Sequence, residues 1–311
     1  MSSEVSSRRV LLVSFLVDVF DVVSNLVVML ITGSAVVFAE MAQGLADSTG
    51  SALLVIGDRR SRRPADARHP FGYAREAFFW ALLSAVAMLI FGAGLSAWRA
   101  YEQFINPQAI EHTWLAMGVV ALAVLTNGYS VSLSLKKLVR EHGSLRRAFR
   151  WMSEPLIKSA LLRDAIGTFT SVVGLLALIL YQLFDLIFFD AFGALVAAVM
   201  MTAASLILMT QARELIAGRA LPEDKVALVR RTFLSTPGVD AVNGLAAVHA
   251  GVSSILIDVD LDLAEGLDTQ QIEALLDILE ERVRESLPNT ERIRVELNSP
   301  GGPRPLRRKG S

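Results

Sequence analysis

The chain has 311 residues, of which 53% are hydrophobic, and its formal net charge is −1. A charge balance so close to neutral gives no reason to expect nucleic acid as a partner, and the lack of cysteine excludes disulfides and thiolate metal sites. The apolar residues are concentrated between 10 and 215, whereas 220–299 has the composition of an ordinary soluble domain. We therefore expect a membrane region followed by one small domain.

Apolar stretches of about 20 residues, enough to cross a bilayer, recur along the membrane region. Six are predicted, with the ranges 10–32, 35–57, 77–101, 113–135, 156–181 and 187–212. The first stretch lacks a small-residue cleavage site, so it is interpreted as a retained helix and not a signal peptide. Ser153, Glu154 and Pro155 are typical of the start of the fifth helix. These features predict an all-α membrane bundle of six helices over residues 1–218.

Lysine and arginine gather in alternate loops of this bundle. The basic loops hold Arg59, Arg60, Arg62, Arg63, Arg68 and Arg75 after the second helix, and Lys136, Lys137, Arg140, Arg146, Arg147, Arg150 and Lys158 after the fourth. The other loops hold almost no basic residue. Because basic loops stay on the cytoplasmic side, we expect both termini and the small domain to be cytoplasmic. This pattern is typical of a multi-pass protein in a bilayer, and we expect the bacterial inner membrane.

Acidic residues lie inside the predicted helices, although a charge at the bilayer centre costs several kcal/mol. Helical spacing places polar residues on one face in four groups: Asp18, Asp21 and Asn25; Glu40, Gln43 and Asp47; Asn127, Ser130 and Ser134; and Asp164 with Thr168. At about 1.5 Å per residue, Asp18, Asp47 and Asp164 each lie roughly 13–16 Å from the inner end of their helix. These three carboxylates are therefore predicted to meet at one depth.

Two interpretations of the aligned acids remain open. In the first, the carboxylates form a cation site or a proton relay, because like charges at one depth repel unless a cation or protons neutralise them. In the second, the acids only form hydrogen bonds between helices. Asp190, at the outer start of the sixth helix, is predicted to be an N-cap that faces water.

Three segments resemble the cation diffusion facilitator family. They are "GSAVVFAEMAQGLADSTGSALLVIGDRRSRRPADARHPFGYAREA", which begins at Gly33, then "LLRDAIGTFTSVVGLLAL", and "GRALPEDK". The resemblance implies six spans, internal termini, a cytoplasmic domain and a homodimer. It also implies export of a divalent cation such as Zn²⁺, Mn²⁺ or Fe²⁺ in exchange for protons, so the partners are the metal ion, protons and lipid, and no resident cofactor is expected.

The family resemblance also implies a transport site built from two residues of the second helix and two of the fifth. The matching positions here are Gln43 and Asp47, with Ala160 and Asp164. Gln43 stands where histidine or aspartate is usual, and Ala160 has no ligand atom. A site without histidine or cysteine suits Mn²⁺, Fe²⁺ or Mg²⁺ better than Zn²⁺.

Two alternatives follow from the incomplete transport motif. Either Asp18, Asp21 or Glu40 replaces the missing ligands, with Thr168 nearby, or the site is degraded and the protein is a non-transporting regulatory or heteromeric partner. Arg163, beside Asp164, favours the second alternative if its side chain points inward.

The basic loop after the second helix contains Asp66 and His69, which match a second, weaker metal site in some family members. The third matching position is Tyr73 and not histidine. We favour a structural role for His69, as a capping or bridging residue in the loop, over metal binding.

The C-terminal region, 219–299, is predicted to be a small α+β domain with the order α-β-β-α-β, like the metallochaperone-like domain of the family. Asp258, Asp260 and Asp262 alternate along one strand and predict a solvated face. We expect dimerisation without a strong zinc site, and a disordered tail over 300–311. A nucleotide loop, a nucleophile–base pair and a redox site are all missing, so an enzyme is not expected. The leading hypothesis is a proton-coupled exporter of divalent metal cations.

Overall fold

The computed structural model describes residues 20–142, 155–251 and 254–298, with the side chains of 155–164 and a few others outside that description. The chain divides into two compact units. The first comprises the described residues up to Arg59 together with Phe79–Arg213. The second comprises Arg60–Phe78 and the residues from Glu214 onward, so the basic loop belongs with the C-terminal region.

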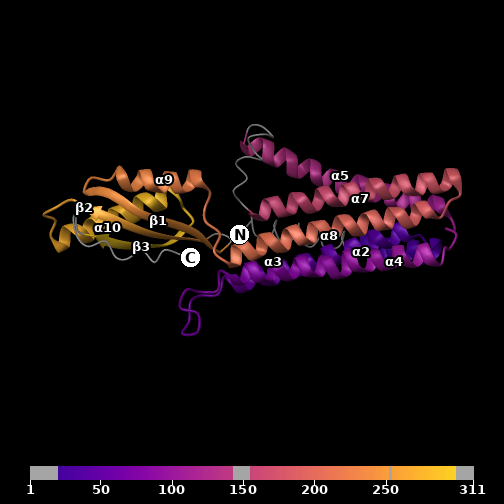
Figure 1. Cartoon of the computed structure of the whole chain (residues 1–311), viewed down its shortest axis with the longest axis horizontal. Helices are drawn as coiled ribbons and strands as arrows, with labels where there is room; N and C mark the ends of the chain where they lie inside the picture. Colours follow the sequence, from indigo (N-terminus) through magenta and orange to yellow (C-terminus); the bar gives the residue numbers. More distant parts are fainter. Residues whose placement is uncertain (1–19, 143–154, 252–253, 299–311) are drawn as a thin grey trace, which may run out of the picture. The chain divides into compact units, whose positions relative to one another are not determined.

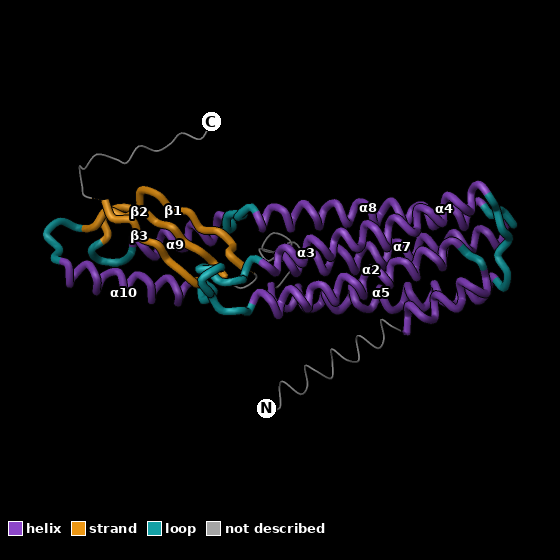
Figure 2. The backbone as a smooth tube through the Cα atoms, turned by 90° about the horizontal axis from the view of Figure 1, so that it is seen from below, coloured by secondary structure: helices purple, strands orange, loops and turns teal. Residues whose placement is uncertain are grey.

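The first unit is built from helices that run alongside one another (Figures 1 and 2). They are Phe20–Thr32, α2 (Ala35–Ser61), α3 (Glu76–Ala87), α4 (Leu95–Ile105), α5 (Thr113–His142), α7 (Pro155–Phe184) and α8 (Phe188–Ile216). A π-helical stretch, η1 (Met88–Gly94), joins α3 to α4 in one continuous rod. α7 is described from Pro155 onward, and the helix start predicted from Ser153 and Glu154 lies outside the described residues.

Among the described residues, four helices are long and apolar enough to cross a membrane: Glu76–Ile105, Thr113–Leu133, Ala165–Phe184 and Phe188–Ile216. Only part of the first predicted span is described, and α2 carries acids in its middle and arginines at its end. Large apolar side chains stay exposed on these helices, such as Trp98 at 56%, Leu125 at 70% and Leu183 at 70%. Such surfaces are stable in contact with lipid and not with water, so the chain is a multi-pass membrane protein.

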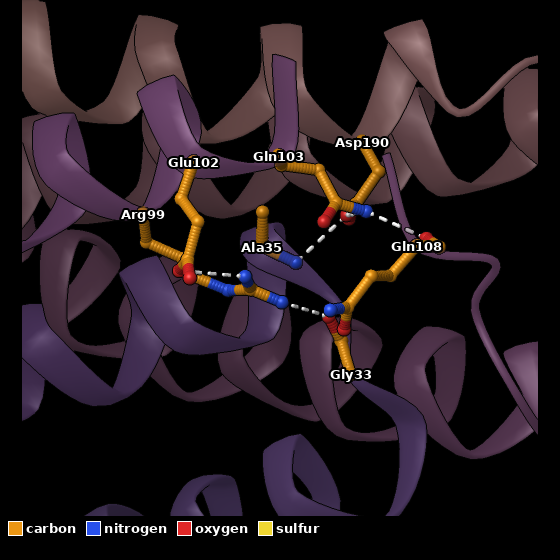
Figure 3. Close-up of polar contacts among 7 residues, drawn as sticks. All are labelled: Gly33, Ala35, Arg99, Glu102, Gln103, Gln108 and Asp190. Carbon is orange, nitrogen blue, oxygen red and sulfur yellow. Dashed lines mark hydrogen bonds and ion pairs between the residues drawn. The ribbon is translucent and has the colours of Figure 1, made fainter. Parts of the chain in front are cut away.

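The N-terminus of α2 is held by a buried carboxylate from α8 (Figure 3). Asp190 accepts hydrogen bonds from Ser34 Oγ at 2.6 Å and from the backbone N–H groups of Ala35 at 2.7 Å and Val36 at 3.1 Å. The side-chain amide of Gln103, on α4, lies 3.4 Å from the same carboxylate. Asp190 has no exposed surface, so the prediction of a water-facing N-cap is wrong. It caps a neighbouring helix, because its position in the bundle brings it against the free N–H groups of α2.

The second unit contains α9 (Glu223–Leu234), β1 (Val239–Gly251), β2 (Ser254–Leu263), α10 (Thr269–Ser286) and β3 (Thr290–Asn298). The sheet has the order β1-β2-β3, with β1 antiparallel and β3 parallel to β2. A capping box at Asp268 and Gln271 starts α10. A C-terminal α+β region with a three-stranded sheet is confirmed.

The sheet of the second unit has one apolar and one polar face. Ile257 and Leu261 of β2 are fully buried with Phe233 of α9 and Leu279 of α10. Asp258 and Asp262 alternate with these residues, and Asp262 accepts a hydrogen bond from Asn243 at 2.9 Å. The alternating pattern predicted this division of faces, because successive side chains of a strand point to opposite sides.

Candidate transport site

The predicted polar face of α2 packs against α7. A Cβ atom added to Gly174 would lie 2.7 Å from Val36 Cγ1, and one added to Gly167 would lie 2.8 Å from Gln43 Nε2. Such short distances show that glycine is what permits the two helices to approach this closely. The close approach leaves little space between the helices, so polar side chains on the shared face must satisfy one another.

A ladder of polar contacts runs along this helix pair. Ser171 Oγ lies 3.1 Å from Glu40 Oε2 and accepts a hydrogen bond from Asn127 Nδ2, on α5, at 3.1 Å. One turn further along, the Thr170 hydroxyl lies 3.0 Å from Gln43 Oε1. Glu40 and Gln43 are 8% and 7% exposed, so both lie inside the bundle and not toward lipid.

Two further acids border the ladder. Asp21, on the helix Phe20–Thr32, and Asp47, on α2, are both close enough to Glu40 to repel its charge. Asp21 faces α2, since its Oδ2 lies 3.6 Å from the Cβ position of Gly44. These carboxylates come from two helices and share one polar region. Among the described side chains, no three acids or histidines are grouped closely enough to hold a metal ion by themselves.

Several predicted ligands cannot be placed. Asp18 lies outside the described residues, as do the side chains of Ala160, Arg163 and Asp164. The backbone at 164 belongs to α7, one helical turn before Gly167. The assignment of Asp47, Asp164 and Gln43 as the transport site therefore stays a prediction.

The structure brings two hydroxyls to the ladder that the sequence analysis did not single out. Thr170 and Ser171 contact Gln43 and Glu40, whereas the methyl group of the predicted Thr168 lies 3.9 Å from the Cβ position of Gly128 on α5. Ser171 is seven residues after Asp164, so extending the helical spacing by one turn would have found it. Ser130, predicted to share a face with Asn127, is exposed.

The loop pair of Asp66 and His69 has a structural arrangement. The Asp66 carboxylate accepts hydrogen bonds from the backbone N–H groups of Arg68 at 2.8 Å and His69 at 2.7 Å, and from the Tyr73 hydroxyl at 2.7 Å. The His69 ring lies against the Tyr73 ring, with centroids 4.1 Å apart. The hydrogen bond from Tyr73, followed by that from His69, lowers the pKa of Asp66. Both Asp66 oxygens are engaged in the loop, which favours the structural role over a metal site.

Comparison with known proteins gives two family matches. The family model for the cation efflux transmembrane domain matches residues 11–216, and that for the cation efflux protein cytoplasmic domain matches 221–299.

Curated relatives resemble most of the chain at low identity. The proton-coupled zinc antiporter SLC30A9, mitochondrial, of Xenopus laevis is 25% identical over 258 residues, covering 82% of this chain and 46% of the relative. Metal tolerance protein C4 of Arabidopsis thaliana is 24% identical, covering 74% and 51%. The cation-efflux pump FieF of Pectobacterium atrosepticum is 24% identical, covering 84% and 83%. The chain thus spans about half the length of the first two relatives.

Proposed function

The chain belongs to the cation diffusion facilitator family, and we propose that it exports divalent metal cations across a membrane in exchange for protons. The metal binds at Asp47 and Asp164, with Gln43 as a third oxygen ligand. The observation that carries this proposal is the register between α2 and α7, which continues from the polar ladder to these two acids.

Three contact pairs define this register: Val36 with Gly174, Glu40 with Ser171, and Gln43 with Gly167. Successive contacts advance by four and then three residues on α2, and by three and then four on α7, as expected for antiparallel helices with about 3.6 residues per turn. The next step in the same alternation pairs position 47 with position 164. Positions 47 and 164 each lie about one helical turn beyond the contact of Gln43 with Gly167, which supports their joint assignment to the site.

The chemistry of Gln43 suits an oxygen-rich site. Its Oε1 lies 3.0 Å from the Thr170 hydroxyl, and an amide oxygen has a second lone pair that can bind a cation. Two carboxylates and an amide oxygen favour hard or borderline ions such as Mn²⁺, Fe²⁺ or Mg²⁺ over tetrahedral Zn²⁺. Glu40, one turn outward, and Asp21 supply further negative charge that attracts the ion or holds protons in its place. The same carboxylates therefore exchange metal for protons.

The remaining architecture follows the family. The six predicted helices all cross the membrane, both termini face the cytoplasm, and the C-terminal domain joins two copies of the chain in a homodimer. The match of 221–299 to a cation efflux cytoplasmic domain supports this role. For a bacterial chain, the membrane is the inner membrane. Transport requires no covalent chemistry, so the protein is not an enzyme.

Metal flux into proteoliposomes tests the proposed site. Asp47→Ala and Asp164→Ala each remove a charged ligand, and we expect each to lower the flux of Mn²⁺, Fe²⁺ or Zn²⁺ by about tenfold or more, since a charged interaction is worth about 1.5–3 kcal/mol. Asp185→Asn, in the outer loop between α7 and α8, is the matched control and should retain flux. Metal-stimulated proton flux that persists in the Asp47→Ala, Asp164→Ala double variant would refute the site.

A second candidate function is that of a non-transporting regulatory or heteromeric partner. It is favoured by Gln43, Ala160 and Arg163, which depart from the family motif. Failure of the purified protein to transport any metal of the panel, with binding retained, would favour this function. Recovery of flux on adding a second family member would establish it.

A further inference from the structure

The second unit contains a large groove that the transport proposal does not use. The basic loop between α2 and α3 forms one wall, and the three-stranded sheet together with α10 forms the other. The groove has a volume of about 1100 Å³. The loop is seated closely, because a Cβ atom added to Gly251 would lie 2.6 Å from Ala74 Cβ. A cavity of this size is close to the upper end of the range of small-molecule binding sites, which is about 300–1,000 Å³.

Arginine dominates the polar lining of the groove. The five arginines are Arg63, Arg75, Arg284, Arg292 and Arg294, and the three acids are Asp258, Glu280 and Glu291. Five positive and three negative groups leave two formal positive charges in the groove. The net charge of the whole chain is −1, so this excess is local and not a reflection of overall composition.

Part of the lining charge is already paired. Glu280 forms an ion pair with Arg284 at 2.9 Å, and Glu291 accepts a hydrogen bond from Ser254. Asp258 lies opposite Arg294 in the parallel pairing of β2 and β3, where it offsets that charge only in part. The groove therefore keeps its positive excess after these contacts are counted.

The two walls present guanidinium groups to the same space. Arg63 and Arg75 come from the loop, and Arg294 from β3; within the described residues none of the three forms an ion pair of 4.0 Å or less. Arg292 lies over the Phe71 ring, 5.2 Å from its centroid, so a cation–π contact fixes the position of its charge. Guanidinium groups bind phosphate oxygens through two parallel N–H bonds, which ammonium groups cannot match.

We propose that this groove binds a phosphate ester, whose phosphate lies between Arg63 or Arg75 of the loop and Arg294 of β3. The volume exceeds that of a single phosphate and leaves room for the organic part beside Phe71. Two sources supply this chemistry, an anionic lipid headgroup or a soluble phosphorylated metabolite. The negative charge of a bound ester attracts the arginines of both walls and so holds the loop against the C-terminal sheet.

Calorimetric titration of the full chain in phosphatidylcholine nanodiscs tests the proposal. The probes are glycerol phosphate and dihexanoyl phosphatidic acid, with glycerol and dihexanoyl phosphatidylcholine as uncharged and zwitterionic controls. We expect a phosphate probe to bind, and Arg63→Gln or Arg294→Gln to weaken binding by about tenfold. Arg68→Gln in the same loop and Arg231→Gln on α9 remove equal charge outside the groove and should change affinity by less than about twofold.

Each outcome decides one point. Absence of binding by both phosphate probes, or equal weakening by the groove and control variants, overturns the proposal. Tighter binding of dihexanoyl phosphatidic acid assigns a lipid source, and equal binding of the two probes assigns a soluble ester. Asp47→Ala should bind the probes as the unaltered chain does, so failure of the transport site and failure of the groove are distinguishable. The four substituted arginines are exposed, and circular dichroism checks that every variant folds.

Discussion

Two carboxylates buried along α2 have opposite surroundings. Asp190, at the N-terminal end of α2, accepts hydrogen bonds from a hydroxyl and two backbone N–H groups, with an amide close by. Glu40, about one turn further in, has a single hydroxyl partner at 3.1 Å within the described residues and two acids nearby. A carboxylate surrounded by donors holds the fold together. A buried carboxylate bordered by other acids has less of its charge compensated, which favours the binding of a proton or a cation.

The largest effect on stability is expected for Asp190→Ala. Removal of the carboxylate leaves the Ser34 hydroxyl and the N–H groups of α2 buried without an acceptor, which costs about 3 kcal/mol in the free energy of unfolding. Thermal unfolding in detergent should show a markedly lower Tm. Asp190→Asn, which keeps one acceptor oxygen, should lose less. An unchanged Tm for Asp190→Ala would show that water replaces the cap.

Gly167→Ala should disturb the site through packing alone. The added Cβ would lie 2.8 Å from Gln43 Nε2, and overpacking of this kind costs about 1–3 kcal/mol. We expect a lower Tm together with reduced metal flux. Gly118→Ala on α5 is the control, because nothing lies within 4 Å of its Cβ position and alanine favours a helix by up to about 1 kcal/mol. Equal effects of the two substitutions would contradict the close register of α2 and α7.

Glu40→Gln should affect metal affinity more than stability, whereas the substitutions at Asp190 are expected to affect mainly stability. Its amide oxygen can still accept from Ser171, and the repulsion with Asp21 and Asp47 disappears, so the free energy of unfolding should change by less than about 1 kcal/mol. The apparent affinity for transported metal should fall by about tenfold, equivalent to about 1.4 kcal/mol. Thermal unfolding checks the expected stability, and the dependence of flux on metal concentration checks the expected affinity. A Tm loss as large as that of Asp190→Asn would assign Glu40 a structural role.

The smallest effect is expected at the exposed Asp66 and Tyr73 pair. The pKa of Asp66 lies below its ordinary value of 3.8, so its stabilising effect is complete above pH 3.8 and is lost as the pH falls through the lower folded value. The pKa of Tyr73 lies above 10.0, mainly because its hydroxyl donates to Asp66, so its contribution is lost as the pH rises through that higher value. Asp66→Asn should lower the phenol pKa, measured by ultraviolet absorbance with Tyr73→Phe as the blank. An unchanged phenol titration would show that the bond does not persist in solution.

Much of the local structure was predictable from short-range patterns. The helices of the first unit begin and end within a few residues of the predicted apolar stretches wherever both ends are described, and the order α-β-β-α-β follows from alternation and capping. The polar face of α2, with Glu40 and Gln43, was also predictable, because residues three and four apart lie on one side of a helix. These features depend on neighbours in the sequence.

Contacts between distant segments were not predictable in the same way. Ser34 and Asp190 are 156 positions apart, and only the packing of α8 against the start of α2 turns a predicted water-facing cap into a buried one. Thr170 and Ser171 are uncharged, so their residue types alone do not mark them as part of a site. They contact Gln43 and Glu40 only because of the register of α7 against α2.

The sequence by itself determined the membrane character of this protein, its family, and which residues carry charge on which helix face, because hydropathy and helical period are local properties. Tertiary structure decided which buried acid is surrounded by hydrogen-bond donors and which has other acids beside it. It also decided that the basic loop lies with the C-terminal sheet and forms a positive groove. The physical reason is that the cost of a buried charge depends on the groups around it, and those groups come from other parts of the chain.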